Sequence, residues 1–309
     1  MPELPEVETM CRGLSPAVGS TIERIEFPEI PYRPIVTTPA PSQWAARLVG
    51  RKILGIERIA KRVVILVAPR NGTNESNSSG SLNKDNLIVG NVPGQLQHAE
   101  ADRIVFQPKM AGIAMISDPP SAAHTRVVLH LSGATCERVL YWDRRGLGTA
   151  HIWTSSECDH YLGPKVLGPD ALSITAEAFS QAFRNLKRPV KPALLDQRLV
   201  AGVGNLYASE ILHLSGIHPE RKCDRIALKS WHSIHRSMQT ILLDAIAHEG
   251  STLNDGTYRN AINGEGGYQN HHRVYGREGE MCLGCHRSHI VRIVQSQRST
   301  FFCKTCQPR

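Results

Sequence analysis

The chain has 309 residues, of which 41% are hydrophobic and 21% charged, so it can bury a sizeable core and does not belong to a fibrous or intrinsically disordered class. No segment approaches 18 uninterrupted apolar residues and the first residues lack the pattern of a signal peptide, so we expect a cytoplasmic protein without a membrane span. The formal net charge is +8, and most of the excess lies in residues 164–309, which carry 19 basic and 12 acidic side chains. Such an excess fits a polyanionic partner, although it is also typical of ordinary solvated surface.

The first predicted element is a helix that begins within Met1-Pro2-Glu3-Leu4-Pro5-Glu6. Proline suits a first helical turn, and an apolar stripe continues along one face, as in an ordinary amphipathic helix with an acidic start. The segment also has a chemical interpretation. If Met1 is removed, Pro2 becomes a secondary amine close to Glu3 and Glu6, which lie three residues apart and share a helix face. Because an α-amino group has a pKa of about 7.7 to 8, such an amine is partly neutral and nucleophilic near physiological pH.

Short apolar or alternating runs then predict an all-β domain, most simply a two-sheet sandwich with the N-terminal helix attached. The predicted strands are residues 21–27, 53–59, 62–67, 103–106, 113–116, 125–131, 138–142 and 149–153. Residues 71–85 are too rich in Asn, Ser and Gly to pack, so we expect a mobile surface insertion over about residues 70–100.

From about residue 167 the pattern becomes helical. The predicted helices are one behind Ser173, a short one at residues 192–197, one that opens at Asn205 and runs to about residue 215, and one at residues 228–248. The expected boundary lies near residues 155–166, so that a catalytic domain at 1–160 precedes a helical domain at 166–270.

The turn Gly202-Val203-Gly204-Asn205 opens the third of these helices. Backbone N–H groups at a helix N-terminus, together with an amide side chain, can hold a phosphate oxygen. A Gly-Asn pair is also a common helix cap, so the motif alone leaves both interpretations open.

Four cysteines gather in the expected last segment, residues 271–309. They read Cys-x2-Cys, 17 intervening residues, and Cys-x2-Cys, which is the spacing of a four-cysteine zinc site in a reducing compartment: Cys282, Cys285, Cys303 and Cys306. His286 and His289 are alternative ligands. Four thiolates leave no open coordination position, so we expect one structural Zn²⁺, and the alternation at residues 297–302 predicts a β-hairpin beside it.

Four separated motifs in the right order, among them residues 1–9, the turn with its helix at residues 200–210, and the zinc segment, resemble the formamidopyrimidine-DNA glycosylase and endonuclease VIII family. The resemblance covers nearly the whole chain except the insertion. The resemblance implies an α+β protein of two domains: an N-terminal β-sandwich with an N-terminal helix, and a C-terminal helix–two-turn–helix domain with a zinc-finger β-hairpin. It implies a bifunctional DNA glycosylase and AP lyase of base excision repair. In that family the mature terminal proline attacks the sugar C1′ of the damaged nucleotide and forms a Schiff base, and β,δ-elimination follows.

The resemblance also assigns roles to residues. Pro2 would be the nucleophile, Glu3 the group that protonates the ring oxygen of the sugar, and Glu6 a residue that positions the terminus. Lys61, which could otherwise be an ordinary lysine at the head of a strand, would join them by binding the phosphates beside the extruded nucleotide. Phosphate contacts are further implied for Asn205 and Arg298, and Lys191 matches another family lysine of the DNA-binding set.

A wedge that fills the gap left by the extruded nucleotide is implied for Met110, Arg145 and Leu147. The family segment Asp-Pro-Arg-Arg-Phe-Gly corresponds here to Asp143-Arg144-Arg145-Gly146-Leu147-Gly148. Leu147 therefore replaces phenylalanine, and Gly146 stands where a phosphate-binding arginine is expected, a contact that Arg144 would have to supply. Residues 253–272 are either the family's lid over the flipped base or a plain connector.

The expected partner is double-stranded DNA that contains a damaged base, bound by a monomer at the bacterial nucleoid and without a membrane. Met110 and Arg145 favour oxidised purines, namely 8-oxoguanine and formamidopyrimidines, as substrates. Two alternatives stay open: an endonuclease VIII-like preference for oxidised pyrimidines, and a damaged-DNA-binding homologue without catalytic activity.

Overall fold

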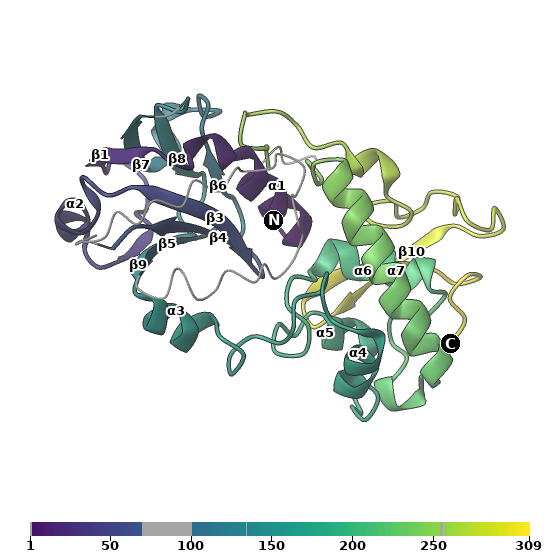
Figure 1. The fold of residues 1–309 in the computed structure, drawn as a ribbon. Coiled ribbons are helices and arrows are strands. Elements are labelled where there is room, and N and C mark those ends of the chain that lie inside the picture. Colours follow the sequence, from purple (N-terminus) through teal and green to yellow (C-terminus); the bar gives the residue numbers. More distant parts are fainter. Residues whose placement is uncertain (1, 70–100, 134, 254–255, 257) are drawn as a thin grey trace. The chain divides into compact units, whose positions relative to one another are not determined.

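The computed structural model describes residues 2–69, 101–133, 135–253, 256 and 258–309. They form two compact units, each with its own core (Figure 1). The first unit comprises Met1–Pro2, Val7–Tyr161 and Thr257–Gly264, and the second comprises Glu3–Glu6, Leu162–Gly256 and Glu265–Arg309. The insertion expected at about residues 70–100 lies almost entirely outside the described residues.

The first unit contains two β-sheets. One has the strand order β1-β7-β8-β6, and the other has the order β2-β9-β5-β4-β3. The strands are β1 (Thr21–Glu26), β2 (Val36–Thr38), β3 (Ile53–Ile59), β4 (Arg62–Val67), β5 (Asp102–Gln107), β6 (Gly112–Met115), β7 (Thr125–Ser132), β8 (Arg138–Asp143) and β9 (Thr149–Trp153). All pairs are antiparallel except β2 with β9. The sequence had not indicated the three-residue strand β2, whose parallel pairing with β9 depends on tertiary context.

The core of this unit lies between the two sheets and also receives the part of the helix α1 (Leu4–Gly13) that begins at Val7. Val7, Met10 and Leu14 are completely buried in it, as the apolar stripe predicted. Residues 63–67 of β4 are buried on both faces of the strand, which explains their uninterrupted apolar sequence. Two further helices complete the unit, α2 (Trp44–Leu48) and α3 (Ser155–Leu162).

The second unit is helical with one β-hairpin. Its helices are α4 (Ala176–Phe183), α5 (Val190–Leu194), α6 (Asn205–Leu214) and α7 (Leu228–Ala247). Thr175 rather than Ser173 caps α4, because its hydroxyl accepts the N–H of Ala178 at 3.2 Å. Helix α5 begins two residues and ends three residues earlier than the sequence indicated. The aromatic residues Phe179, Phe183 and Trp231 join α4 to α7 in the core.

The hairpin consists of β10 (Ile290–Gln295) and β11 (Arg298–Cys303). Its two turn residues, Ser296 and Gln297, have φ values of +47° and +62°, which is typical of the tight turns that match strand twist. The register pairs Gln295 with Arg298, so Arg298 lies at the tip. The α+β architecture predicted from the sequence, including the helical region and the zinc-finger hairpin, is confirmed. Within the described ranges, no helix combines the length and apolar character needed to cross a membrane.

Candidate active site and DNA interface

The Glu3 carboxylate lies at the N-terminus of α6, within the second unit. Its Oε1 accepts the backbone N–H of Leu206 at 2.9 Å, and its Oε2 accepts that of Tyr207 at 3.5 Å. Glu3 is 2% exposed. Because the first N–H groups of a helix have no partner inside the helix and lie at the positive end of its dipole, this position stabilises a carboxylate. The acid next to Pro2 is therefore fixed by a segment about 200 residues away.

This placement limits which N–H groups near the Gly202–Asn205 turn are available to a DNA phosphate. The N–H groups of Leu206 and Tyr207 bind a carboxylate of the same chain, so they do not hold a DNA phosphate in this arrangement. The N–H of Gly202 is likewise used, because it donates to Gln197 Oε1 at 2.9 Å.

Glu6 forms the second half of the N-terminal site. Its Oε2 accepts the N–H of Glu3 at 2.8 Å, the reciprocal contact of a capping box, and its Oε1 accepts the N–H of Ser251 at 2.9 Å and the hydroxyl of Tyr207 at 2.5 Å. Burial raises the pKa of Glu6, and the nearby Glu3 raises it further. Glu6 thereby holds the peptide group that directly follows Pro2, which is itself buried.

Lys191 organises the region around Asn205 and the hairpin. Its ammonium donates to Asn205 Oδ1 at 2.8 Å, to the carbonyl of Ser299 at 3.0 Å and to Thr300 Oγ1 at 2.7 Å. Three acceptors match the three donors of a lysine, and the side chain is only 1% exposed. The geometry therefore makes Lys191 a residue that positions Asn205 and β11 rather than one with a free ammonium. Burial lowers the pKa of Lys191 to about 7; Glu3 acts against this shift and Arg298 adds to it.

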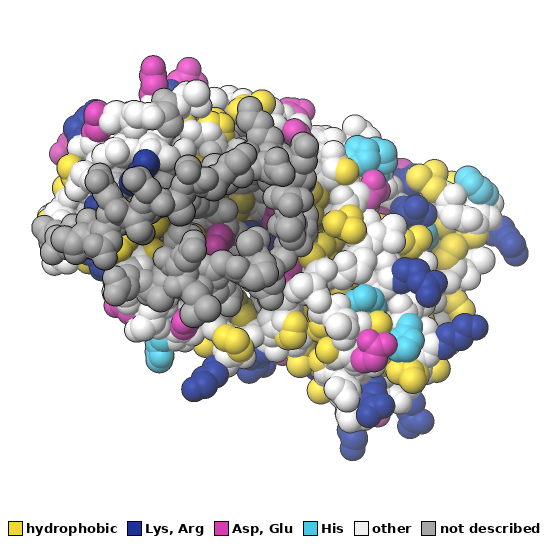
Figure 2. All heavy atoms as spheres, in the orientation of Figure 1, with side chains coloured by type: hydrophobic (Ala, Val, Ile, Leu, Met, Phe, Trp, Pro, Cys, Tyr) yellow, Lys and Arg dark blue, Asp and Glu magenta, His cyan; other side chains and the backbone are white. Residues whose placement is uncertain are grey.

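Arg298 differs from Lys191 because it is exposed. Its guanidinium makes no hydrogen bond or ion pair with any residue that the structure describes. Its strand neighbour Ser299 uses its carbonyl to accept both Lys191 and the side-chain amide of Asn205, at 3.0 Å each. A solvent-facing guanidinium thus lies beside a rigid polar network. Lys and Arg side chains are spread over the surface of the second unit (Figure 2).

Strand register gathers three predicted DNA-binding segments at one end of the first unit. The loop with Met110 leaves β5 after Gln107 and enters β6 at Gly112, and the loop with Arg145 and Leu147 joins β8 to β9. The ends of the two loops are paired, since Gly112 lies opposite Asp143 and Gln107 opposite Thr149. Lys61 lies in the turn between β3 and β4, and β4 pairs with β5 at Val63 and Phe106. Lys61, Met110, Arg145 and Leu147 are therefore on neighbouring loops.

Asp143 shapes the loop that carries Arg145. Its carboxylate accepts the N–H of Arg145 at 3.0 Å and that of Gly148 at 2.6 Å. Gly146 between them has a φ of +60°, and a Cβ there would lie 2.4 Å from the carbonyl oxygen of Arg33. The backbone conformation of the loop thus explains why glycine replaces the expected arginine at this position, because any side chain would clash. Met110 and Arg145 are exposed and Leu147 is half-buried.

The sulfur atoms of Cys282, Cys285, Cys303 and Cys306 all lie within 4.8 Å of one another, and two of the pairs are 3.7 Å apart. Tetrahedral coordination with Zn–S bonds of about 2.3 Å requires sulfur separations of about 3.8 Å, so the cluster fits one structural zinc ion. Among the described residues this set contains no histidine, so His286 and His289 are not ligands. His213 Nε2 on α6 lies 3.4 Å from Cys282 Sγ, a contact that the sequence did not indicate.

Several other contacts could not be read from the sequence. Glu210 of α6 is completely buried and accepts the backbone N–H groups of Arg273, Val274 and Tyr275 at 2.8 to 3.0 Å, which ties the start of the zinc segment to α6. Part of the region considered as a lid is bonded to the end of α7: the N–H of Tyr268 donates to the carbonyl of Gly250 at 2.9 Å.

Three family models match the sequence. Residues 1–150 match the formamidopyrimidine-DNA glycosylase N-terminal domain, residues 167–257 match the H2TH domain of the same enzyme, and residues 285–309 match the zinc finger found in FPG and IleRS. The chain is 36% identical to the formamidopyrimidine-DNA glycosylase of Methylobacterium sp. (strain 4-46) and 32% identical to that of Chloroflexus aggregans, with at least 98% of each chain covered.

Solved structures agree with these relatives. The Lactococcus lactis protein in complex with Fapy-dG-containing DNA is similar with a TM-score of 0.80 and 29% identity, over all of both chains. The Thermus thermophilus protein is similar with a TM-score of 0.76 and 30% identity, over 99% of this chain and 98% of that one. With matches along nearly its whole length, the chain is a member of the formamidopyrimidine-DNA glycosylase family, the DNA glycosylases and AP lyases of base excision repair.

Proposed function

We propose that this enzyme excises oxidised purines, 8-oxoguanine and formamidopyrimidines, from double-stranded DNA and then cleaves the strand, with Pro2 as the nucleophile once Met1 has been removed. The observation that carries the proposal is the fixation of the N-terminal segment by both of its carboxylates. Glu3 is held by the first N–H groups of α6, and Glu6 accepts the N–H of Glu3. A reactive group is effective when its geometry is set before substrate binds.

The first chemical step makes a bond between the Pro2 nitrogen and C1′ of the damaged nucleotide. The bond from C1′ to the base breaks, and the base leaves with the proton of the Pro2 nitrogen. A proton that Glu3 takes up from solvent goes to the ring oxygen, so that the sugar opens and Glu3 returns to its carboxylate form. The product is a positively charged iminium, in which the nitrogen withdraws electrons from the sugar. Loss of a proton from C2′ then expels the 3′ phosphate, and a second elimination expels the 5′ phosphate.

DNA binding in this proposal uses exposed and half-buried groups from each unit. In the first unit, Lys61 binds phosphates beside the lesion, and Met110, Arg145 and Leu147 fill the space left by the extruded nucleotide. In the second unit, Arg298 and Asn205 contact phosphate, and Lys191 supports both by holding Asn205 and Thr300. Zinc, when bound by its four cysteines, keeps the hairpin that carries Arg298 in shape. We propose that one molecule acts alone.

The preferred lesion is the finer part of the proposal. The Lactococcus lactis relative was crystallised with Fapy-dG-containing DNA, and in another structure with DNA containing an oxidised pyrimidine. Both lesion classes therefore need a direct comparison. An arginine that reaches the orphaned base, as proposed for Arg145, favours lesions opposite cytosine because guanidinium and cytosine acceptors pair well.

The test is borohydride trapping on matched duplexes. Intact mass spectrometry first establishes that Met1 is absent. The protein is then incubated with 8-oxoguanine opposite cytosine, with a formamidopyrimidine opposite cytosine, and with thymine glycol opposite adenine, and borohydride is added to each. We expect covalent complexes mainly with the two purine lesions and none with protein that retains Met1. Pro2→Gly, whose terminus is still a primary amine, should be trapped much more slowly. Preferential trapping on thymine glycol would favour the pyrimidine alternative, and binding without trapping on any duplex would favour a non-catalytic homologue.

A further inference from the structure

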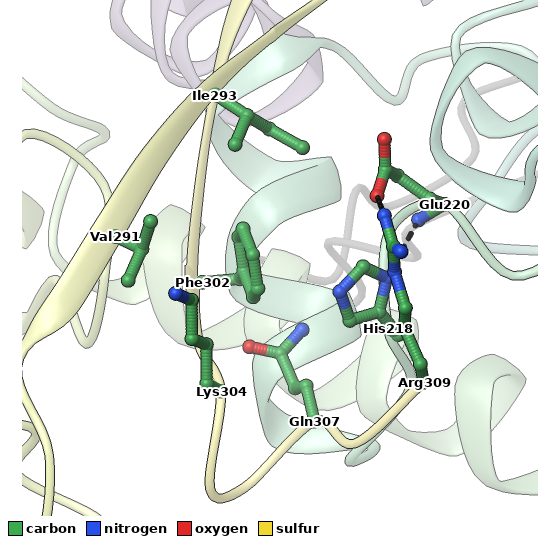
Figure 3. A pocket seen from close by; sticks show the side chains of 8 residues that line it. All are labelled: His218, Glu220, Val291, Ile293, Phe302, Lys304, Gln307 and Arg309. Carbon is green, nitrogen blue, oxygen red and sulfur yellow. Dashed lines mark hydrogen bonds and ion pairs between the residues drawn. The ribbon is translucent and has the colours of Figure 1, made fainter.

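A pocket of about 460 Å³ lies between the hairpin and the chain that follows α6, entirely within the second unit. Its apolar wall comes from Val291 and Ile293 of β10 and Phe302 of β11, all on one face of the hairpin (Figure 3). Phe302 packs edge-on against the ring of His218, with ring centres 4.8 Å apart. Its volume falls within the range of about 300–1,000 Å³ that is typical of ligand pockets. None of these residues belongs to the proposed catalytic or DNA-binding set.

The free polar groups of this pocket are hydrogen-bond donors. His218 is only 5% exposed, and its Nδ1 accepts the backbone N–H of Glu220 at 3.2 Å, so the neutral ring carries its proton on Nε2. That Nε2–H has no partner within the described part of the chain, and the ring reaches into the pocket (Figure 3). Lys304 is exposed and also makes no contact with a described acidic group.

Each side chain that offers an acceptor to the pocket already has a partner. The Glu220 carboxylate pairs with the guanidinium of Arg309 at 2.6 Å. The Gln307 amide accepts one backbone N–H at 3.0 Å and donates to one carbonyl at 2.8 Å. Because the Arg309 side chain is 82% exposed, it keeps further donors directed to solvent. A ligand for this pocket must therefore supply an anion or acceptor together with an apolar group.

We infer that this pocket binds the C-terminus of a partner protein, with the α-carboxylate on His218, Lys304 and Arg309 and a large apolar last side chain against Val291, Ile293 and Phe302. A peptide C-terminus carries its carboxylate and its last side chain on the same carbon atom. The two groups therefore lie as close together as the donors and the apolar wall of the pocket do. A DNA phosphate would satisfy the donors but would leave the apolar wall unfilled.

The probe is a fluorescein-labelled peptide, Gly-Ser-Gly-Ser-Phe with a free carboxylate, titrated with zinc-loaded protein in a polarisation assay. Expected is saturable binding with a Kd of about 10–100 µM, weakened at least about 10-fold when the peptide is amidated or ends in serine. Lys304→Glu should weaken binding at least about 10-fold, and Val291→Asp, which places a charge in the apolar wall, should abolish it. Lys229→Glu, an exposed lysine on α7, is the matched control and should change Kd less than about twofold.

Zinc content and borohydride trapping of the Lys304→Glu variant should equal those of the unaltered protein, so a failure here is separate from a failure of the glycosylase proposal. Equal binding of the free and amidated peptides would overturn the inference, as would unchanged binding by Lys304→Glu or no saturation up to about 1 mM peptide. Displacement of the peptide by one equivalent of lesion duplex would overturn it too, because the pocket would then belong to the DNA interface.

Discussion

A Cβ atom on residue 204 would lie 2.1 Å from the carboxyl carbon of Glu3. Gly204 therefore leaves the space in which the Glu3 carboxylate reaches the N–H of Leu206 at 2.9 Å. The backbone of Gly204, with φ of −125° and ψ of −165°, is accessible to any residue. The requirement for glycine here comes from the Glu3 side chain and not from the turn.

Gly204→Ala should consequently reduce catalysis more than folding. The added methyl group displaces the Glu3 carboxylate, and a misplacement of about 1 Å in a reacting group can cost about 100-fold in rate. We expect single-turnover trapping on 8-oxoguanine to slow by about 10- to 100-fold, with a fall of only a few degrees in Tm. Gly55→Ala is the control, because its Cβ would meet nothing closer than 3.5 Å. Unchanged trapping by Gly204→Ala would show that the position of Glu3 is not critical.

Glu6 should make stability depend on pH. Burial, followed by repulsion from Glu3, raises its pKa in the folded protein above the ordinary value of 4.5. The folded state therefore binds the Glu6 proton more tightly than the unfolded state does. The contribution of Glu6 to the free energy of unfolding is fully present below pH 4.5 and is lost as pH rises through its pKa in the folded protein. The free energy of unfolding, measured in urea from about pH 4 to 8, should fall across this window for the unaltered protein relative to Glu6→Gln.

The absolute effect of Glu6→Gln should also be a loss of stability. All three neighbours of the carboxylate donate to it, so at least one of them faces the amide NH₂ in either orientation of glutamine, at a cost of about 1–3 kcal/mol. Tyr207→Phe removes one donor whose hydrogen bond lowers the Glu6 pKa. The Glu6 pKa in the folded protein should therefore rise further, and the pH range over which stability falls should widen. Parallel curves for the unaltered protein and Glu6→Gln would contradict the assignment.

Regular patterns made most of the fold predictable. Alternating or apolar runs identified eight strands of the first unit, the 3.6-residue period identified the helical region, and cysteine spacing identified the zinc ligands. These signals are local, since each needs only neighbouring residues. The short strand β2 carries too few residues for such a pattern, and its parallel partner β9 is more than 100 residues away.

The site was less predictable because its contacts join distant segments. The sequence around the start of α6 does not show which anion its N–H groups bind. A DNA phosphate and the Glu3 carboxylate, 203 positions away, fit the same local pattern. The sequence shows Lys191 only as a basic residue near a helix. The fold shows that its side chain is enclosed by Asn205 and β11. Composition indicates which groups exist, but tertiary packing decides which of them remain exposed.

Gly146→Arg, which restores the residue expected from the family, should harm this protein. Gly146 has a positive φ, and a Cβ there would lie 2.4 Å from the Arg33 carbonyl oxygen, so the loop must move. We expect a loss of about 1–3 kcal/mol in unfolding free energy and weaker binding to lesion duplex. Arg144→Ala, which leaves the backbone intact, is the comparison. Tighter DNA binding by Gly146→Arg at unchanged Tm would show that the loop tolerates the side chain.

Lys191 should make DNA affinity depend on pH. Its pKa is lowered to about 7, mainly by burial. A phosphate bound near Asn205 and Arg298 favours the ammonium and raises this pKa in the complex. The affinity gained in this way is fully present below about pH 7 and is lost as pH rises through the pKa of the complex.

The measurement for Lys191 is binding to a duplex with a tetrahydrofuran abasic analogue. Between about pH 6 and 9, binding should weaken by about 10-fold per unit of pKa difference between the free protein and the complex. Lys191→Met should bind weakly and without this dependence, whereas Lys229→Met should retain it. The same slope in Lys191→Met would exclude Lys191 as its source.

His213 links α6 to the zinc ligands, and its replacement should loosen the metal. A zinc-bound thiolate has no proton, so His213 Nε2, 3.4 Å from Cys282 Sγ, is the donor in this contact. Hydrogen bonds to metal ligands typically contribute about 10- to 100-fold in metal affinity, so His213→Phe should release zinc to a chromogenic chelator at least about 10-fold faster. His213→Gln, which keeps an N–H donor, should release zinc at a rate between those of the unaltered protein and His213→Phe. His289→Phe is the control, because His289 is outside the cysteine cluster. Arg298 and Thr300 belong to the hairpin that the zinc site holds, so duplex binding should decline as zinc content falls. If zinc were lost without a change in DNA binding, the hairpin would keep its shape without the metal.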